Sequence, residues 1–228
     1  MKKIVALLGA TVFAATAANA GTLSFDFSNP LQTTEISQTG KLGLFDTNLG
    51  NLTSVSLTFS GNNTTRLSLT NNAAQSQTTK AVATTDLSFS SDLLSLNSLL
   101  GSTPLVSLSA ETGFVSLAAG ATQSFGPLLD SDSVNWTSQL NGILSSFTKA
   151  GGGQFDLSCS SLSGIGITGG GGNIASTQNT QAACGAQIVY TYADKPVPPV
   201  NVPEPASLAL VGLALGAVGL ASRRRKAA

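Results

Sequence analysis

The stretch Val55-Ser56-Leu57-Thr58-Phe59 places an apolar side chain at every second position and a hydroxyl side chain between them. Successive side chains of an extended strand point to opposite faces, so this stretch predicts one apolar and one polar face. The same alternation recurs at residues 22–27, 66–70, 86–89, 106–109, 114–117, 155–157 and 188–192. Many short strands separated by turn residues predict an all-β domain, mainly an antiparallel sandwich or barrel.

Two segments depart from the strand pattern. One carries Trp136, Leu140, Ile143, Leu144 and Phe147 at helical spacing, which predicts one short amphipathic helix packed on a sheet. Asp132 or Ser133 is its expected N-cap, and Gly151 follows its end. The other carries Leu93, Leu96, Leu99 and Leu100, between Ser91-Asp92 and Gly101, and could form a shorter helix. The glycine-rich residues 169–173 are expected to form a flexible loop.

The N-terminus has the three parts of a secretory signal peptide. Lys2 and Lys3 precede an apolar run from Ile4 to about Ala18, and Ala18-Asn19-Ala20 forms an A-x-A cleavage site. We expect cleavage after Ala20, which leaves Gly21 as the first residue of the mature protein. The alternative is an uncleaved N-terminal anchor.

The C-terminus combines a polar turn, an apolar segment and a basic end. Residues 206–222 contain no charge, and a helix of these 17 residues reaches about 25 Å at ~1.5 Å per residue, the short end of a membrane span. Arg223, Arg224, Arg225 and Lys226 would form its cytoplasmic stop, so the preceding chain lies outside the cytoplasm. On these physical grounds a sorting tail and an ordinary single-pass anchor remain equally open.

The motif Pro203-Glu204-Pro205, the short apolar segment and the terminal arginine cluster resemble the PEP-CTERM sorting signal of Gram-negative bacteria. This resemblance implies processing by an exosortase, a membrane protease that removes the anchor in organisms that make exopolysaccharide. It implies an inner-membrane intermediate, followed by release to the cell surface or the extracellular matrix. Signal peptidase and exosortase are thus the expected processing partners, and contact with the membrane is transient.

Removal of both ends changes the charge of the protein. The full chain is formally neutral, but 5 of its 11 basic residues and 10 of its 11 acidic residues lie between Gly21 and Lys195. A mature domain with a net charge of about −5 lacks the basic patch that nucleic-acid binding requires. We expect a signal peptide at 1–20, one β-rich domain at 21–195, a proline-rich linker at 196–202 and a sorting signal at 203–228.

The body of the chain also has family-like landmarks. Pro30-Leu31-Gln32-Thr33-Thr34, the stretch from Leu44 to Leu57, the segment from Phe147 to Phe155 and Val189-Tyr190-Thr191-Tyr192 resemble the choice-of-anchor E domain. The resemblance implies a secreted surface protein whose body is joined to different anchors in different bacteria, and it transfers no site residues. In the second stretch, Asp46 and Gly50 are typical turn residues before a strand.

Cys159 and Cys184 are the two cysteines of a chain predicted to be exported. An even number in an oxidising compartment favours a disulfide, which would close a loop of about 26 residues. Free or intermolecular thiols are the alternative.

The residues point away from catalysis, and we expect no enzyme activity, no cofactor and no metal. The chain has no histidine, which removes the commonest general base and the commonest zinc ligand. Asp130-Ser131-Asp132 has the spacing of a calcium loop but lacks the later ligands, so a helix-capping turn is the preferred interpretation. Residues 164–169 match G-x-G-x-x-G only by letter. Carboxylate pairs for glycoside hydrolysis could come from Asp26, Asp86, Asp130 or Asp156.

These observations predict a structural or adhesive surface protein of an exopolysaccharide matrix or biofilm. Rows of Ser, Thr and Asn on sheet faces would hydrogen-bond glycans. One alternative is a module that binds a glycan or another small ligand in an aromatic-lined pocket, for which Trp136, Tyr190 and Tyr192 are the candidates. A hydrolase is the third and weaker alternative.

Overall fold

The computed structural model describes residues 20–195 and 211–215. The chain divides into two units, Met1–Lys195 and Pro196–Ala228, and each is described by itself. In the second unit residues 211–215 are helical, and no helix of the described residues is long and apolar enough to cross a membrane. The predicted span at 206–222 otherwise lies outside these residues.

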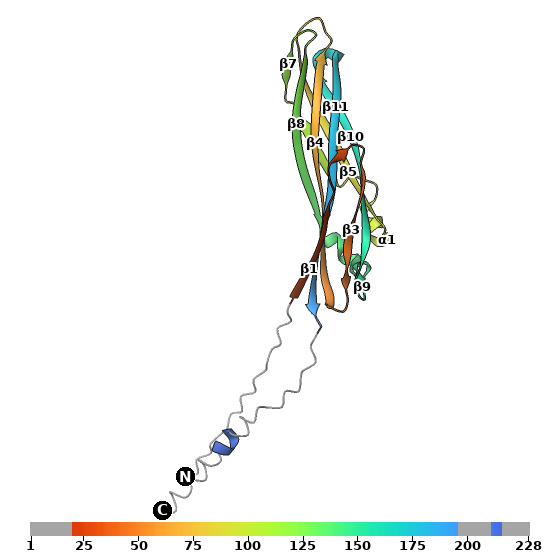
Figure 1. Ribbon diagram of the computed structural model, residues 1–228, viewed down its shortest axis with the longest axis vertical. Coiled ribbons are helices and arrows are strands. Elements are labelled where there is room, and N and C mark those ends of the chain that lie inside the picture. The colour runs from red at the N-terminus through yellow and green to blue at the C-terminus, as the bar shows by residue number, and fades with distance from the viewer. Residues whose placement is uncertain (1–19, 196–210, 216–228) are drawn as a thin grey trace, which may run out of the picture. The chain divides into compact units, whose positions relative to one another are not determined.

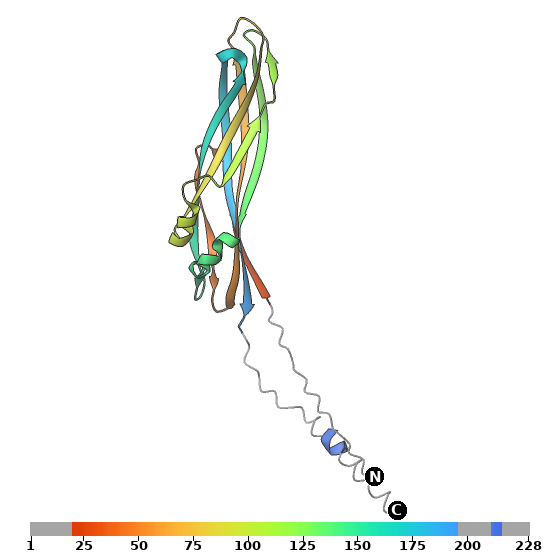
Figure 2. The same ribbon diagram turned by 180° about the vertical axis from the view of Figure 1, so that it is seen from behind.

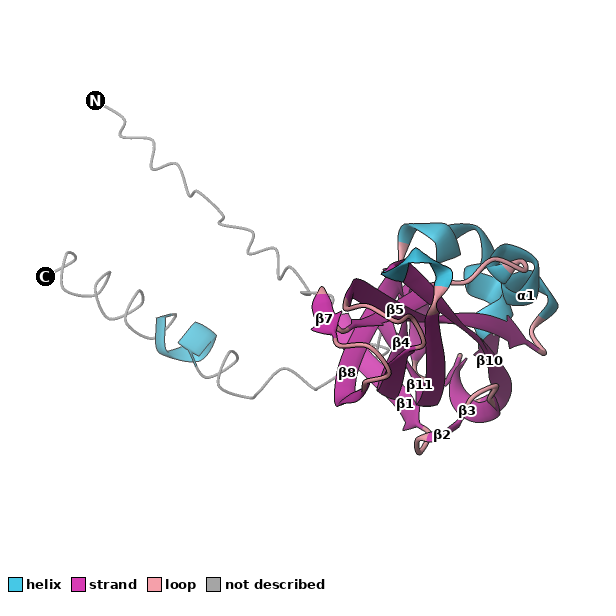
Figure 3. Ribbon diagram, turned by 90° about the horizontal axis from the view of Figure 1, so that it is seen from above, coloured by secondary structure: helices cyan, strands magenta, loops and turns pink. Residues whose placement is uncertain are grey.

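The first unit is a β-sandwich of two mainly antiparallel sheets (Figures 1 and 3). Sheet A has the order β1-β11-β4-β8, and β2 pairs with β11. Sheet B has the order β6-β5-β10-β3-β9, and β7 pairs with β5; only the short β3–β9 pair is parallel. The strands of sheet A are β1 (Ala20–Ser28), β2 (Gln32–Thr33), β4 (Gly50–Asn71), β8 (Thr122–Trp136) and β11 (Ile174–Asp194). Those of sheet B are β3 (Ser37–Asp46), β5 (Gln77–Ser91), β6 (Val106–Glu111), β7 (Val115–Leu117), β9 (Thr148–Lys149) and β10 (Gly153–Gly169).

Every predicted strand segment lies in a strand, except that Phe114 precedes the start of β7 at Val115, and this agreement confirms the all-β fold. The expectation of many short strands is wrong for β4, whose 22 residues include both residues 55–59 and residues 66–70. The alternation continues through the intervening Gly61-Asn62-Asn63. Gly61 leaves room for Leu87 of the facing sheet, and the Asn63 side chain bonds inward to Thr85. Small and amide residues thus replace apolar ones on the inner face without ending the strand.

The predicted amphipathic helix is wrong in its position. Residues up to Trp136 belong to β8, and only Ser138–Phe147 (η1) forms helical turns, of the 3₁₀ type and interrupted at Ile143. Asp132 and Ser133 are not N-caps, because they lie opposite Gly61 and Ser60 of β4 in the sheet ladder. The apolar residues of the pattern do face the core: Leu140 and Phe147 are buried, and Trp136 packs edge-on against Phe59.

The shorter leucine-rich segment forms the helix α1 (Leu94–Leu100), as expected. Its Leu96 and Leu100 are buried, and α1 and η1 lie near each other beside the lower half of the sandwich in Figures 1 and 2. The glycine-rich residues form a turn between β10 and β11 with a short 3₁₀ helix, η2 (Gly170–Gly172).

The interior contains two apolar clusters separated by polar residues. The larger cluster includes Phe45, Phe59 and Phe155, and the smaller one consists of Leu67, Leu69, Ala81, Ala83 and Leu117. Between them lie buried Asn63, Thr65, Thr85 and Thr180, of which Thr65 and Thr180 share a 3.0 Å hydrogen bond. A buried hydroxyl or amide is tolerated when it is hydrogen-bonded, and the three threonines and the Asn63 amide nitrogen are paired in this way. The buried Asn63 Oδ1 has no partner among the described residues.

The two ends of the domain differ in what they contain. Ala20 pairs with Ala193, so the first and last strands begin and end together, at the bottom of the domain in Figure 1. The turns β4–β5 and β10–β11 and strand β7 lie at the opposite end (Figures 1 and 2). The connection to the C-terminal sorting segment therefore leaves the domain beside its N-terminal strand.

Candidate binding surface and sorting segment

The outer surface of sheet A is a long row-by-row array of hydroxyl and amide side chains, which we call the polar face. On β4 it extends from Ser54 to Thr70, every second residue of which points outward. At ~3.3 Å per residue this row is about 50 Å long. The register sets neighbours beside it from β11 and β8. The outward polar side chains are Ser54, Ser56, Thr58, Ser60, Asn62, Thr64, Arg66, Ser68 and Thr70 of β4; Thr177, Asn179, Gln181 and Gln187 of β11; and Thr122, Ser124, Ser131, Ser133 and Asn135 of β8. The exposed Leu129 of β8 interrupts them opposite Thr64.

Side chains at the two ends of the polar face bond to one another. At one end Asn135 Nδ2 donates to Ser56 Oγ and to Thr58 Oγ1, both at 2.8 Å. At the other end the Thr70 and Thr122 hydroxyls lie 2.8 Å apart. These groups already have partners within the protein.

The middle of the polar face is different. Among the described residues, the side chains of Ser60, Asn62, Ser131 and Ser133 form no hydrogen bond to one another or to their neighbours. They line a shallow groove of about 440 Å³. Gly185 also lines it, where a Cβ atom would lie 2.8 Å from the Phe27 carbonyl and 3.1 Å from Ser60 Oγ. The groove thus offers hydroxyl and amide groups, together with the Asp132 carboxylate that also lines it, to a ligand from outside.

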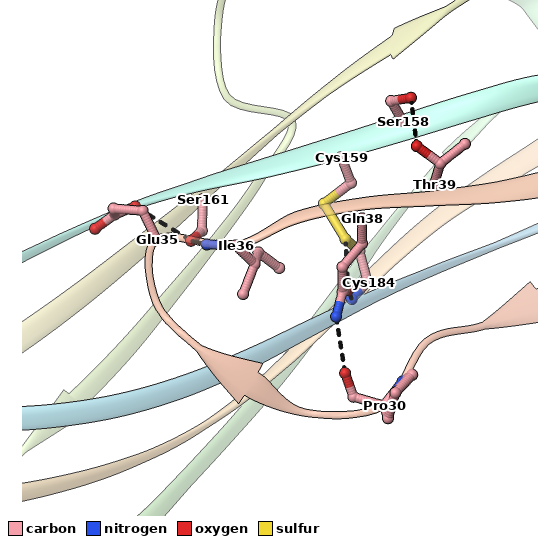
Figure 4. The surroundings of a disulfide bond; sticks show 9 residues. All are labelled: Pro30, Glu35, Ile36, Gln38, Thr39, Ser158, Cys159, Ser161 and Cys184. Atoms are coloured by element: carbon pink, nitrogen blue, oxygen red, sulfur yellow. Dashed lines mark hydrogen bonds between the residues drawn. A yellow bond between two sulfur atoms is a disulfide. The ribbon is translucent and has the colours of Figure 1, made fainter.

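The two cysteines form a disulfide, which confirms the prediction (Figure 4). Cys159 is in β10 and Cys184 in β11, so the bond joins sheet B to sheet A; the Cα atoms are 6.6 Å apart. Beside it Gln38 of β3 donates from Nε2 to the Pro30 carbonyl at 2.8 Å, and its Oε1 accepts from Cys184 N at 3.1 Å. The bond and this amide together fix the spacing of the sheets at one point.

The aromatic residues proposed for a ligand pocket pack inside the domain. Tyr190 is fully buried, donates its hydroxyl to the Gly43 carbonyl at 2.7 Å, and contacts the rings of Phe25 and Phe45. Burial raises the pKa of this phenol above its ordinary value. Tyr192 packs on Phe45, and none of the three candidates lines the groove at Ser60 or the groove at Arg66. The structure thus gives no support to an aromatic-lined site at these residues.

Among the carboxylates considered for hydrolysis, Asp86 is not brought together with Asp156, nor Asp26 with Asp130. Asp86 lies opposite Leu162 of β10, six residues from Asp156, which corresponds to about 20 Å along the strand. Asp26 and Asp130 lie in the opposite edge strands of sheet A. These separations exceed the roughly 5–9.5 Å between carboxyl groups in glycosidases.

Three of the four carboxylates have structural partners. Asp86 accepts from Ser107 Oγ of β6 at 2.7 Å. Asp130 accepts from Ser109 N at 2.7 Å and so links β8 of sheet A to β6 of sheet B. Asp156 accepts from Lys41 Nζ, which raises the pKa of the ammonium group.

Asp130-Ser131-Asp132 lies within β8, so neither a calcium loop nor a helix-capping turn is formed there. Residues 164–169 lie within β10 rather than in a loop before a helix. Within residues 20–195 and 211–215 no cluster of three potential metal ligands occurs.

Asp46 joins two turns of the domain, a role that the sequence did not predict. Asp46 Oδ1 accepts from Asn48 N and from Gly151 N, both at 2.8 Å, and so joins the β3–β4 turn to the turn before β10. These two backbone bonds lower the pKa of the Asp46 carboxyl. The turn prediction for Asp46 and Gly50 is confirmed, but the second bond, 105 residues away in sequence, left no local signal.

The predicted processing residues lie mostly outside the described part of the chain. Ala20 and Gly21 are the first residues of β1, and Gly21 lies opposite Tyr192. Ala18 of the signal cleavage site, the motif Pro203-Glu204-Pro205 and the basic residues Arg223, Arg224, Arg225 and Lys226 are outside it.

Comparison with solved structures finds viral proteins of low similarity. The structure of infectious bursal disease virus Gt strain is 14% identical, with 88% of this chain and 47% of that chain covered and a TM-score of 0.15. The structure of T=1 particles derived from infectious bursal virus is 14% identical, with 91% of this chain and 49% of that chain covered and a TM-score of 0.17. Tobacco streak virus coat protein is 11% identical, with 83% of this chain and 98% of that chain covered and a TM-score of 0.21. The chain spans about half the length of the first two.

A search of the curated proteins finds no match. A family model does match the C-terminus: residues 201–226 fit the PEP-CTERM protein-sorting motif. This match confirms the sorting signal expected from Pro203-Glu204-Pro205, the apolar segment and the arginine cluster. The motif implies an exported surface protein that an exosortase processes in a membrane-associated sorting step of Gram-negative bacteria.

Proposed function

We propose that the mature protein binds exopolysaccharide through the polar face of sheet A and has a structural or adhesive role, without enzyme activity, in a biofilm matrix. Its body, in this proposal, is a choice-of-anchor E-like domain at 21–195. The observation that carries the proposal is the groove at Ser60, Asn62, Ser131 and Ser133, whose side-chain polar groups have no partner among the described residues. The sorting motif supports it, because the motif implies delivery to the surface.

The chemistry of the polar face suits a sugar polymer. Each hydroxyl and amide can donate and accept, as the hydroxyls of a glycan can. One such bond contributes only about 0.5–1.5 kcal/mol net, so useful affinity needs many of them along one chain. A row about 50 Å long supplies repeated contacts, and linked contacts raise the overall affinity.

The test is binding of the full-length protein, in a non-ionic detergent, to immobilised polysaccharides. The set contains dextran, polygalacturonate and methyl-esterified polygalacturonate. The variant S60A/N62A/S131A removes three groups from the groove. The control T84A/S88A/S160A removes three outward hydroxyls from β5 and β10 of sheet B.

We expect the first variant to bind at least one polymer about tenfold more weakly, as loss of three weak hydrogen bonds predicts. We expect the control to bind as the wild type does, and both variants to keep the wild-type melting temperature. Wild-type protein that binds none of the polymers, or equal losses in the two variants, would contradict the proposal.

Processing has its own test. Intact-mass analysis of cell fractions and culture supernatant should find a chain that starts at Gly21 and ends near Pro203, with Cys159 and Cys184 oxidised. A mature chain that still contains Arg223 to Lys226 would instead indicate a permanent anchor.

A further inference from the structure

The β4–β8 ladder of the polar face contains one irregularity, and it lies opposite the only arginine of the face. Thr65 of β4 pairs with Leu128 and Leu67 pairs with Phe125, so Gly126 and Pro127 of β8 together oppose the single residue Arg66. This is a β-bulge, a feature that bends a strand and redirects a side chain, often beside a functional site. Gly126 has φ +108°, and a Cβ atom there would lie 2.6 Å from the Thr65 carbonyl oxygen. Only glycine fits this bulge without strain.

The bulge borders a groove of about 500 Å³ around Arg66. The groove is lined by polar side chains of all three strands, among them Ser68, Ser124, Thr177 and Asn179. No carboxylate is among its lining residues. Asn179 lies directly opposite Arg66 on β11, so an amide and hydroxyls surround the guanidinium.

Arg66 is also free to bind a ligand. Lys41 pairs with Asp156 and Lys80 with Glu111, but within residues 20–195 and 211–215 Arg66 forms no salt bridge and no side-chain hydrogen bond. Its side chain is exposed. Asp26 lies opposite Gln187, which in turn lies opposite Thr58 of β4. Thr58 is eight residues from Arg66 along β4, so Asp26 is roughly 26 Å from Arg66 in the strand direction. That distance exceeds the Debye length of about 8 Å at physiological salt, so Asp26 offsets the charge of Arg66 little. Asp130 is nearer, opposite Asn63 and so about 10 Å away along β4, but it accepts a hydrogen bond from Ser109 N of β6.

We propose that Arg66 and the groove around it form an anion subsite that selects acidic polysaccharides, with a uronate carboxylate as the preferred group. A guanidinium presents a planar fork of donors that matches a carboxylate, and the neighbouring hydroxyls can bind the adjoining sugar hydroxyls. The inference rests on the proposed function, because it assigns a class of polymer to the same face.

The test compares matched pairs of polymers with the full-length protein in a non-ionic detergent at 0.15 M salt. Polygalacturonate and its methyl ester share a backbone but differ in carboxylate charge. Dextran sulfate and dextran make the same comparison for sulfate. The variants are R66Q, which removes the charge, R66K, which keeps the charge without the fork, and K149Q, which removes a charge from β9, outside the polar face.

We expect the wild type to prefer polygalacturonate over its methyl ester, and R66Q to bind the acid form about three- to tenfold more weakly, as loss of one exposed charge-assisted contact predicts. R66K should recover part of the affinity, and K149Q should bind as the wild type does. A stronger Arg66-dependent preference for dextran sulfate over polygalacturonate would overturn the uronate assignment and replace it with a sulfate subsite.

Equal loss in R66Q and K149Q would overturn the subsite, because it would indicate only a change in net charge. Polymer binding that depends on Ser60, Asn62 and Ser131 but not on Arg66 would also overturn the subsite and leave the proposed function standing. Absence of binding to every polymer would overturn both.

Discussion

Reduction of the Cys159–Cys184 bond should destabilise the domain by an amount set by the loop it closes. The bond joins residues 25 apart in sequence, so the closed loop contains about 26 residues. In the chain-entropy model such a loop contributes about 3.5 kcal/mol at 25 °C, through restriction of the unfolded chain. For a domain of this size that corresponds to a fall of about 7–14 °C in melting temperature.

Urea unfolding of oxidised and TCEP-reduced wild type isolates the cross-link, because the reduced protein keeps both sulfur atoms. We expect a lower free energy of unfolding on reduction, and a larger m-value because the reduced unfolded chain is more expanded. The double variant C159A/C184A should be as stable as the reduced wild type or less, since both sulfur atoms are buried and their removal also loses packing.

The variant Q38A serves as the control for the surrounding network. It removes the bonds to Cys184 N and to the Pro30 carbonyl but leaves the disulfide, so reduction should cost the variant as much as it costs the wild type. A loss below about 1 kcal/mol on reduction of the wild type would refute the reasoning, because the chain-entropy model then fails for this loop.

Three further predictions concern packing and charge. Gly40→Ala should lower the free energy of unfolding by about 1–3 kcal/mol in urea titrations, because the new Cβ atom would lie 2.2 Å from the Phe27 ring; an unchanged midpoint would show that the ring moves aside freely. Tyr190→Phe should cost about 1–2 kcal/mol by calorimetry, because the Gly43 carbonyl loses its buried donor, and a stabilised variant would contradict this. The Asp46 carboxyl has a folded pKa below its unfolded value, so its contribution is present above the unfolded pKa and is lost as the pH falls through the folded pKa. Asp46→Asn should therefore be less stable than the wild type at pH 7 and approach it near pH 3, in thermal unfolding across that range.

The strands could be predicted from local sequence because their inner residues are mostly apolar and their outer residues hydroxylic. Val55, Leu57 and Phe59 are all fully buried, as their alternation with Ser56 and Thr58 requires. The disulfide followed from the number of cysteines and the predicted export. These features depend on short stretches or on simple counts, which one sequence provides.

The predictions that failed depend on contacts distant in sequence. β8 contains Gly126-Pro127 and has exposed residues on both faces, so its alternation is weak and the helical spacing after Trp136 was the stronger signal. The segment at 132–133 is a strand because β4 pairs with it, not because of its own residues. The inward Asn63 and Thr65 read as polar loop residues, and only their partners Thr85 and Thr180 on other strands explain their burial. The free middle of the polar face could not be predicted either, since it depends on which hydroxyls bond to one another.

The position of the chain ends has a consequence for binding. Because Ala20 pairs with Ala193, the links to the N- and C-terminal segments leave the domain at one end, and the groove at Ser60 and Asn62 lies within sheet A, away from those ends. Arg66 lies further still from Ala193 along the β4–β11 ladder. Its partner Asn179 is 14 residues of β11 from Ala193, or roughly 46 Å. A polymer bound along β4 would contact the groove, whose lining includes the Asp132 carboxylate, and the guanidinium toward the far end. Selectivity for acidic chains would then depend on a segment of polymer long enough to reach Arg66, so short oligomers should be bound with less discrimination than long ones.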